Sequence, residues 1–404
     1  MITKAEKGLY IRYQLKEMGQ LDKKRILNKL YKELADSLNI SDTMTKEVVN
    51  SYNAVGNYLG EMEENLDIRV FPQGSLALGT VVRPFKNDEE ADYDVDLVCL
   101  LENGSELKAE RIKKIVGNRL AESERYQKML DVEGKRCWTL QYSNFHMDIL
   151  PSVPLSVNLV PSDVDTKIRI THKDDSGEYT DRNSDPKSYR DWFISQMELT
   201  YTKSREIFAE SRKMEVEKIK LYNLRTPLQM AIQILKRHRD VMFSKKDNKP
   251  ISIIITTLAA KAYNDEDNLF EAIENILNKM HEFITVDNAG DVIICNPAME
   301  SENFADKWKE EPEKKQAFNE WLVAAKKDII QNPLEFVDGF GNMKNSMRGI
   351  FGNRVVDESF DNYELLNVNN RSDGLLGVTS KGNITDAKQK SVVVPLKEHT
   401  FYGS

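Results

Sequence analysis

The sequence predicts an α+β protein, with a mixed α/β N-terminal half followed by an all-helical C-terminal half. In residues 67–100 and 137–150, short apolar runs are bounded by turn residues, a pattern typical of strands. From residue 188 onward, apolar residues instead recur at helical spacing. The chain has 404 residues, too many for one compact core, so we expect two domains plus extensions. A cleft between the two halves is the natural place for a ligand.

The N-terminal half begins with helices and continues into strands. Residues 5–64 carry apolar side chains at roughly helical spacing, and Ser41 is placed to cap a second helix within them. A short strand over residues 68–71 and a turn at residues 72–75 follow. Residues 94–100 then form the strongest strand signal of the chain.

The remaining elements of this half alternate between helix, hairpin and loop. Residues 106–121 favour a helix. Residues 137–142 and 145–150 favour paired strands, joined by a tight Ser-Asn turn. Residues 151–190 are polar, and we expect them to form loops that line or cross a cleft.

The C-terminal half is expected to contain a series of helices. Pro227 after Thr226 is a strong start signal, because proline suits the first helical position. Asn332 and Pro333 should end the last helix of the series. Residues 366–391 have little apolar periodicity, which predicts a mobile tail. The expected helices span residues 189–212, 226–243, 251–263, 269–285 and 314–331.

Composition limits the possible classes of protein. With 40% hydrophobic and 30% charged residues, the chain fits a soluble globular protein. The net charge of -8 argues against binding extended nucleic acid, although a local basic groove stays possible. Three widely spaced cysteines indicate neither a disulfide framework nor a zinc cluster. The N-terminus has no apolar signal core, and the longest apolar stretch, residues 251–262, is too short to cross a bilayer. We therefore expect a cytoplasmic protein that does not enter a membrane.

Three aspartates are the most informative residues of the chain. Asp94 and Asp96 are two positions apart on the predicted strand, so they point to one face, and Asp148 lies in the strand 145–150. Together they could hold two divalent cations, as nucleotidyl transfer requires. Asp92 shares that face and competes with Asp96 as the partner of Asp94. The alternative is a solvated strand edge, but clustered carboxylates repel each other unless a cation or proton intervenes.

A Gly-Ser turn precedes the aspartates and could bind phosphate. Gly74 permits a tight turn and a close approach of the backbone to a ligand. Ser75 offers an N–H and a hydroxyl to phosphate oxygens, and Thr80, after Gly79, repeats this chemistry one helical turn later. The alternative is an ordinary strand-to-helix turn. Combined with the aspartates, the turn points to transfer of a nucleotidyl group from a nucleoside triphosphate.

Three segments together resemble a known family. They are residues 73–80 (Gln-Gly-Ser-Leu-Ala-Leu-Gly-Thr), 92–98 (Asp-Tyr-Asp-Val-Asp-Leu-Val) and 146–151 (His-Met-Asp-Ile-Leu-Pro). They are similar to the CD-NTases, the bacterial cGAS/DncV-like nucleotidyltransferases with a polymerase-beta-like fold. The resemblance covers roughly residues 10–345. Gln-Gly-Ser stands where Gly-Gly-Ser is frequent in the wider superfamily, but the Gly-Ser pair is kept.

The resemblance implies a fold and a division of the chain. The fold would be α+β, with a polymerase-beta-like nucleotidyltransferase core of a mixed sheet and flanking helices plus an all-helical C-terminal domain. Residues 1–200 would form the core with its long N-terminal helices. Residues 201–345 would form the helical domain that closes the cleft, and residues 346–404 an extension and tail.

The resemblance also implies roles for individual residues. Asp94, Asp96 and Asp148 would be the catalytic metal ligands, for two Mg²⁺ ions that Mn²⁺ could replace. Gln73 and Ser75 would contact the donor nucleotide.

A helix with a basic end, residues 228–240, could complete the nucleotide site. Lys236 would lie over the triphosphate, although cations at a helix C-terminus are also favoured by the helix dipole. Arg237 and Arg239 cannot both point the same way as Lys236, so we expect at least one at the surface. His238 is expected to pair with an acid rather than act as a base. Ser252, at the start of the next helix, could bind phosphate or merely cap the helix.

The resulting hypothesis is a Mg²⁺-dependent cyclic oligonucleotide synthase. By resemblance, it would make a cyclic di- or trinucleotide second messenger from ATP and another nucleoside triphosphate, in CBASS anti-phage defence. Partners would be CBASS ancillary proteins, including machinery that conjugates the C-terminus at Ser404. The rivals are a transferase with a linear product, such as an oligoadenylate synthase or an enzyme that modifies RNA or protein, and a non-catalytic nucleotide-binding scaffold.

Overall fold

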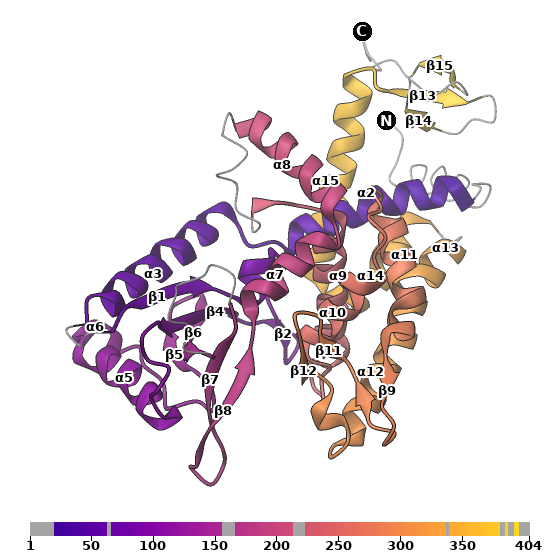
Figure 1. The fold of residues 1–404 in the computed structure, drawn as a ribbon. Helices are drawn as coiled ribbons and strands as arrows, with labels where there is room; N and C mark the ends of the chain where they lie inside the picture. The colour runs from indigo at the N-terminus through magenta and orange to yellow at the C-terminus, as the bar shows by residue number, and fades with distance from the viewer. Residues whose placement is uncertain are drawn as a thin grey trace.

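The computed structural model confirms a mixed sheet with flanking helices, joined to a helical C-terminal region (Figure 1). It describes residues 20–62, 66–155, 166–212, 223–336, 339–379, 384–386 and 392–395. The helix expected over residues 5–19 therefore lies outside the described residues.

A six-stranded sheet forms the centre of the N-terminal half. Its order is β1-β4-β6-β7-β8, and β5 also pairs with β6. β4 and β6 run parallel, and the other pairs in the sheet are antiparallel. The strands are β1 (Ile68–Pro72), β4 (Tyr93–Leu101), β5 (Trp138–Gln141), β6 (Phe145–Pro154), β7 (Ile168–Lys173) and β8 (Tyr179–Ser184).

The two faces of this sheet have different surroundings. Val95 and Leu97 of β4 and Met147 of β6 are fully buried in a core that includes residues of α3 (Asp42–Gly60) and α5 (Ala109–Glu122). Because side chains alternate along a strand, the even-numbered residues of β4 point to the opposite face. There, Val98 and Leu100 pack against β7.

The helical region surrounds a second, larger core. α9 is buried over most of its length, and the N-terminal helix α2 packs into the same core beside α9, α11 and α15 (Figure 1). The longer helices here are α2 (Gln20–Leu38), α7 (Pro186–Ser195), α8 (Glu198–Arg212), α9 (Pro227–Met242), α10 (Ser252–Ala262), α11 (Leu269–Lys279), α12 (Pro312–Ala325), α14 (Phe340–Phe351) and α15 (Asn353–Ser372).

Several short elements connect the larger ones. The short helical elements are α4 (Gly74–Leu78), α6 (Glu124–Gln127), η3 (Met280–Phe283), η4 (Asp306–Trp308), η5 (Lys326–Gln331) and α13 (Asn332–Glu335). The short strands are β2 (Phe85–Lys86), β3 (Glu89–Glu90), β9 (Thr285–Val286), β10 (Val292–Ile293), β11 (Cys295–Asn296), β12 (Met299–Asn303), β13 (Leu376–Thr379), β14 (Ile384–Asp386) and β15 (Val392–Pro395).

The helix start signals that the sequence predicts are present in the structure. Ser41 caps α3 by accepting a hydrogen bond from the N–H of Met44. Thr226 and Gln229 form a reciprocal capping box at the start of α9, with Pro227 in the first turn. These bonds satisfy backbone N–H groups that a helix leaves open at its first turn.

Some expectations about secondary structure are wrong. Residues 151–190 are not mainly loops, because β6 extends to Pro154 and residues 168–184 add β7 and β8. Residues 189–212 form two helices, α7 and α8, instead of one. The helical backbone continues past Pro333, which lies in the first turn of α13, where its missing N–H costs nothing.

The C-terminal half also differs in detail. It contains the short strands β9 to β12, so it is mainly but not wholly helical. α15 continues to Ser372, and β13 to β15 follow it, so the described parts of the expected tail have regular structure. No helix among the described ranges is long and apolar enough to cross a membrane.

Candidate active site

The three aspartates lie together on the sheet face opposite α3 and α5. In the parallel β4–β6 pair, Asp96 is opposite Asp148 and Asp94 is opposite His146. The hydroxyl of Thr139, on β5, donates a 2.6 Å hydrogen bond to Oδ1 of Asp148. His146 Nδ1 lies 3.6 Å from Oδ1 of Asp94. Two adjacent strands thus place three carboxylates side by side.

The electrostatics of this cluster favour a bound cation. Burial, followed by the charges of Asp148 and Asp94, raises the pKa of Asp96 to about 7. Partial removal from water by the surrounding protein, followed by the charge of Asp148, also raises the pKa of Asp94, although its side chain is largely exposed. Carboxylates that raise one another's pKa are stabilised when a cation joins them. The donor set, made only of oxygen atoms, suits Mg²⁺.

The carboxylates alone do not make a closed metal cage. Among the described residues, no group of three His, Cys, Asp or Glu side chains is arranged so that it could hold a metal ion by itself. Mg²⁺ usually takes only one or two protein carboxylates and completes its shell with water and substrate phosphates. The residues therefore fit a metal that is shared with a nucleotide.

The structure separates Asp92 from the other candidates. Asp92 precedes β4, is exposed, and lies 3.9 Å from Nε2 of His146. Asp94 and Asp96 instead line a cavity of about 430 Å³, which Asp92 does not. The geometry therefore favours Asp96 over Asp92 as the partner of Asp94.

Gly74 brings the start of α4 against Asp96. Its φ of +58° lies in the left-handed region, and a Cβ there would lie 3.2 Å from Cγ of Asp96 and still closer to Oδ2. The N–H of Gln73 donates a 2.9 Å hydrogen bond to the carbonyl of Asp96. Both the φ angle and the close approach require glycine. The Gly-Ser segment of the sequence motif therefore directly contacts β4, the strand that carries Asp94 and Asp96.

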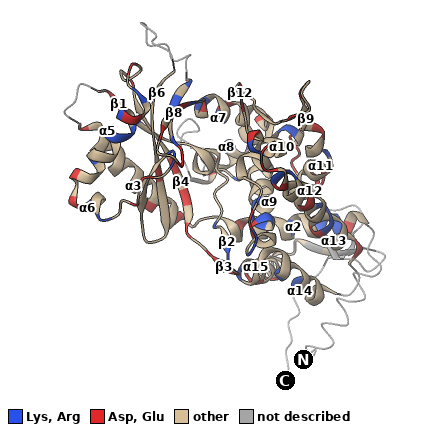
Figure 2. Cartoon of the chain, turned by 90° about the horizontal axis from the view of Figure 1, so that it is seen from below, with Lys and Arg blue, Asp and Glu red and all other residues tan. Residues whose placement is uncertain are grey.

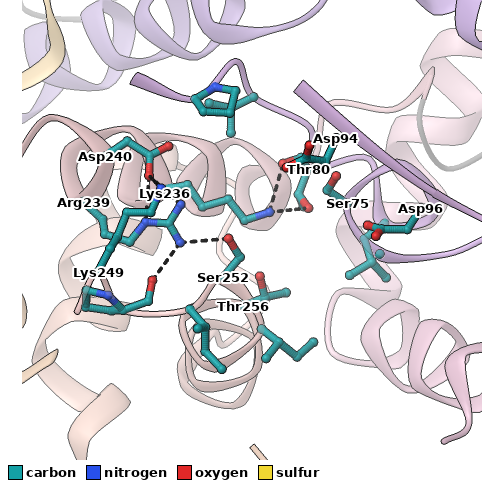
Figure 3. Close-up of a pocket in the computed structure, with 17 residues that line it drawn as sticks. Ser75, Thr80, Asp94, Asp96, Lys236, Arg239, Asp240, Lys249, Ser252 and Thr256 are labelled. Carbon is teal, nitrogen blue, oxygen red and sulfur yellow. Dashed lines mark hydrogen bonds and ion pairs between the residues drawn. The ribbon is translucent and has the colours of Figure 1, made fainter. Parts of the chain in front are cut away.

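A cavity of about 430 Å³ lies between α4 and β4 on one side and α9 and α10 on the other (Figure 3). Asp94 and Asp96 of β4 and Lys236 and Arg239 of α9 belong to its lining. Figure 2 shows acidic segments on β4 and basic segments on α9. Its lining contains seven of the sequence-predicted residues: Gly74, Ser75, Thr80, Asp94, Asp96, Lys236 and Ser252.

Lys236 extends from α9 along the wall of this cavity. Its Nζ donates to both the backbone carbonyl and Oγ1 of Thr80, each at 3.1 Å (Figure 3). Burial, followed by the charge of Arg239, lowers the pKa of Lys236 to about 7, against the opposing charges of Asp240 and Asp96. An anionic ligand in the cavity would supply the charge partner that Lys236 lacks.

Next to Lys236, a second group of charges was not predicted from the sequence. Arg239 donates to Ser252 Oγ at 2.8 Å and to Oδ1 of Asp240 at 2.7 Å (Figure 3). Lys249 Nζ lies 3.1 Å from the same Asp240 oxygen. Asp240 and Lys249 gave no motif in the sequence, because nothing local marks a pair that meets across a loop.

The position of Ser252 excludes the interpretation that it caps the helix. Ile251 occupies the N-cap position of α10, and Ser252 is the first helical residue. Its hydroxyl accepts from Arg239 instead of capping the helix.

The expectation that Arg237 or Arg239 lies at the surface is wrong. Both guanidinium groups are buried. Arg237 donates to the carbonyl of Phe351 at 2.8 Å and to Oε1 of Glu90 at 3.0 Å, and it lies over the ring of Phe85. The prediction for His238 is confirmed, since its Nε2 lies 3.3 Å from Oδ2 of Asp328.

A second cavity, of about 940 Å³, adjoins the first. The two share Gly74, Leu78, Asp96, the segment from Lys249 to Ile251, and Ile253. Gln73 lines only the second cavity. Asp96 therefore faces two compartments, each large enough for part or all of a nucleotide.

Comparison with known proteins agrees with this geometry. Residues 26–196 match the family model described as the Second Messenger Oligonucleotide or Dinucleotide Synthetase domain, SMODS. A c-di-GMP synthase from Roseivirga ehrenbergii is 29% identical over 390 residues, which cover 92% of this chain and 96% of that protein.

Solved structures share the fold. The CD-NTase CdnG of Bradyrhizobium diazoefficiens, in complex with GTP, has a TM-score of 0.64 at 20% identity, covering 84% of this chain and 99% of that one. The cyclic AMP-GMP synthase DncV of Vibrio cholerae, in complex with nonhydrolyzable GTP, has a TM-score of 0.51 at 16% identity, covering 89% and 93%. The chain therefore contains a SMODS domain, has the fold of solved CD-NTase structures and is a nucleotidyltransferase.

Proposed function

We propose that this chain synthesises a cyclic dinucleotide from nucleoside triphosphates, with GTP as at least one substrate. The observation that carries the proposal is the position of Asp96, which pairs with Asp148 across the sheet, lies on the same strand as Asp94, and lines both of two adjoining cavities. One cavity can hold a donor triphosphate while the other holds the nucleotide whose ribose hydroxyl attacks it. A non-catalytic scaffold would gain nothing from a cluster of three carboxylates in which the pKa values of Asp94 and Asp96 are raised by burial and by neighbouring charges.

Asp94, Asp96 and Asp148 would hold two Mg²⁺ ions, which Mn²⁺ could replace. Such ions, when bound, neutralise charge on the triphosphate and lower the pKa of the attacking hydroxyl. Thr139 would keep the Asp148 carboxylate oriented through its 2.6 Å hydrogen bond.

The rest of the first cavity would bind and orient the donor triphosphate. Lys236 and the Arg239–Ser252 pair supply positive charge and donors on the side opposite Asp94. Ser75 and Thr80 line the same cavity from the α4 side, and Gln73 borders the acceptor cavity. A phosphate that approaches Lys236 would replace its present hydrogen bonds to Thr80.

The reaction would proceed in two similar steps. The ribose hydroxyl of the acceptor attacks the α-phosphate of the donor and releases its proton to solvent. A new P–O bond forms, and pyrophosphate leaves with the electrons of the broken P–O bond. The linear product then re-enters with its ends exchanged and closes in the same way. One set of carboxylates next to two cavities suits both steps.

GTP is favoured because the relative that spans nearly the whole chain is named a c-di-GMP synthase. ATP, which the sequence resemblance suggested as a substrate, stays a prediction, as does a cyclic trinucleotide. A role in CBASS defence, a cytoplasmic location and conjugation of the C-terminus also stay predictions. Residues 396–404 lie outside the described residues.

The test is to incubate the purified chain with the four nucleoside triphosphates and Mg²⁺, and to identify products by mass spectrometry. A product that resists phosphatase and nuclease P1 would be cyclic for most linkages, whereas a linear-product transferase would give a sensitive one. The double change Asp94→Asn and Asp96→Asn should abolish synthesis without unfolding the protein. Asp92→Asn is the matched control, since Asp92 is an exposed carboxylate of the same segment and lines neither cavity.

A further inference from the structure

The lining of the second cavity contains a carboxylate that is held by hydrogen bonds and not by a direct ion pair with any described residue. Glu302, on β12, lines this cavity, and its Oε2 accepts a 2.8 Å hydrogen bond from Nδ2 of Asn296. Asn296 is only 2% exposed, and its own Oδ1 accepts from the N–H of Ala298, so it is a fixed support. Within the described part of the chain, Glu302 forms no ion pair.

This setting needs an explanation, because carboxylates removed from water are usually paired with a cation or donors. Burial raises the pKa of Glu302, and the Asn296 hydrogen bond, the charge of Arg136 and a hydrogen bond with Ser184 act in the opposite direction. Asn296 and Ser184 take up two of the roughly four acceptor sites that a carboxylate offers. The group therefore retains acceptor capacity toward the cavity.

The charge of Glu302 indicates which part of a nucleotide would lie here. A carboxylate repels the phosphates, so this end of the cavity suits a base. Phe304 and Trp308 line the second cavity but not the first, and they supply aromatic surface of the kind that a base packs against. The phosphates would then lie toward Asp96 and Lys249, where the two cavities meet.

Among the four bases, guanine matches a carboxylate best. Its N1–H and N2–H₂ are adjacent donors on one edge, so a carboxylate can accept from both. Adenine and cytosine present a ring-nitrogen acceptor beside their amino group, which a carboxylate would repel. Uracil has a single donor between two carbonyl oxygens.

Arg136 could complete the recognition. It lines the same cavity from the segment before β5, and no described residue hydrogen-bonds or ion-pairs with it. Guanine offers O6 and N7 to a guanidinium, the commonest specific pairing of arginine with a base.

We propose that Glu302, supported by Asn296, reads the N1–H and N2–H₂ edge of a guanine in the second cavity and so selects the acceptor nucleotide. This inference rests on the proposed function, because it assigns the second cavity to the acceptor. It goes further by naming the base and the residue that selects it.

The first test uses the unmodified chain and needs no catalysis. Binding of GMP, IMP and AMP is measured by calorimetry; these ligands lack the β- and γ-phosphates that the first cavity would hold. IMP lacks only the N2 amino group, and its loss leaves a hydrogen bond to a charged group unmade, so IMP should bind about 10-fold more weakly than GMP. AMP should bind more weakly still. Equal binding of the three would overturn the proposal.

The second test exchanges the carboxylate for an amide. In Glu302→Gln the amide oxygen can still accept from Asn296, while the amide N–H₂ would face the base and suit the N1 acceptor of adenine. The ratio of AMP to GMP binding should rise at least 10-fold, and an equimolar mixture of GTP and ATP should give more adenine in the product. A purely structural role for Glu302 would lower binding of all bases equally. Glu300→Gln is the matched control, because Glu300 is exposed on the same strand and outside the cavity lining.

The outcomes separate the two proposals. If GMP is preferred but no triphosphate yields a phosphodiester, the proposed function fails and base recognition stands. If product forms but Glu302→Gln leaves the base preference unchanged, base recognition fails and the proposed function stands.

Discussion

Gly74→Ala should remove most of the synthase activity while the protein stays folded. The φ of Gly74 is +58°, and an added Cβ would lie 3.2 Å from Cγ of Asp96 and closer to its Oδ2. Ordinary van der Waals contacts of a Cβ begin near 3.4 Å. Either the Asp96 carboxylate or the start of α4 must therefore move.

The magnitude follows from two separate effects. An alanine in the left-handed region costs about 1–2 kcal/mol of folding free energy. Relief of the overlap requires the carboxylate to shift by about 1 Å, and misplacement by that amount can cost about 100-fold in rate. We therefore expect a modest loss of stability and a loss of about 100-fold in kcat.

Gly177→Ala separates these effects. Gly177, in the β7–β8 hairpin, also has a positive φ, +89°, but a Cβ there would meet nothing within 4 Å. It should show the same stability loss with unchanged activity. The assay compares initial rates of dinucleotide formation with melting temperatures for both variants. If Gly74→Ala retains wild-type activity, or if Gly177→Ala loses as much, the assigned contact with Asp96 is wrong.

Two further predictions concern residues outside the cavities. Glu90→Gln should lower the free energy of unfolding by about 3 kcal/mol, because Arg237 is buried against Glu90 and would lose its charge partner. Burial acts to raise the pKa of Glu90, but Arg354 and Arg237 hold this pKa below its usual value. The stabilisation is therefore fully present above the pKa of Glu90 in the unfolded chain, and it is lost as the pH falls through the pKa of Glu90 in the folded protein. Chemical denaturation of the unmodified chain and of Glu90→Gln, from neutral to acidic pH, measures this dependence. A difference in the free energy of unfolding that persists at low pH would contradict it. Thr139→Val should lower kcat by about 10-fold with little change in KM, since a hydrogen bond to a charged group contributes about 1.5–3 kcal/mol and this one orients Asp148. Steady-state kinetics measure the change, and an unaltered kcat would exclude a positioning role.

The aspartate cluster was largely predictable because its signals are local. The spacing of Asp94 and Asp96 fixes their common face, and the Ser-Asn turn fixes the strand of Asp148. The register that places Asp96 opposite Asp148 was not predictable, because parallel pairing joins residues far apart in the chain. The same limit applies to the closeness of Gly74 to Asp96.

Strand β8 was missed in the sequence for a physical reason. β8 is almost wholly polar, with exposed side chains along one edge of the sheet, so neither apolar alternation nor a buried run marks it. Its backbone pairing with β7 holds it instead. Sequence patterns detect burial, and this strand has little.

The buried charges of α9 were missed for the opposite reason. A basic helix end is ordinarily exposed, because burial of a charge without a partner is costly. Arg237 and Arg239 are buried because Glu90 and Asp240 pair with them. Glu90 comes from a hairpin almost 150 residues earlier, so no helical pattern could identify it.

The most direct test of the central claim is the mass of the product. The chain incubated with the four nucleoside triphosphates and Mg²⁺ should yield pyrophosphate and a guanine-containing cyclic dinucleotide that resists phosphatase. The same reaction with Asp94→Asn and Asp96→Asn should yield none, and Asp92→Asn should match the unmodified chain. Absence of any phosphodiester product, or an equal yield from the double variant, would contradict the account.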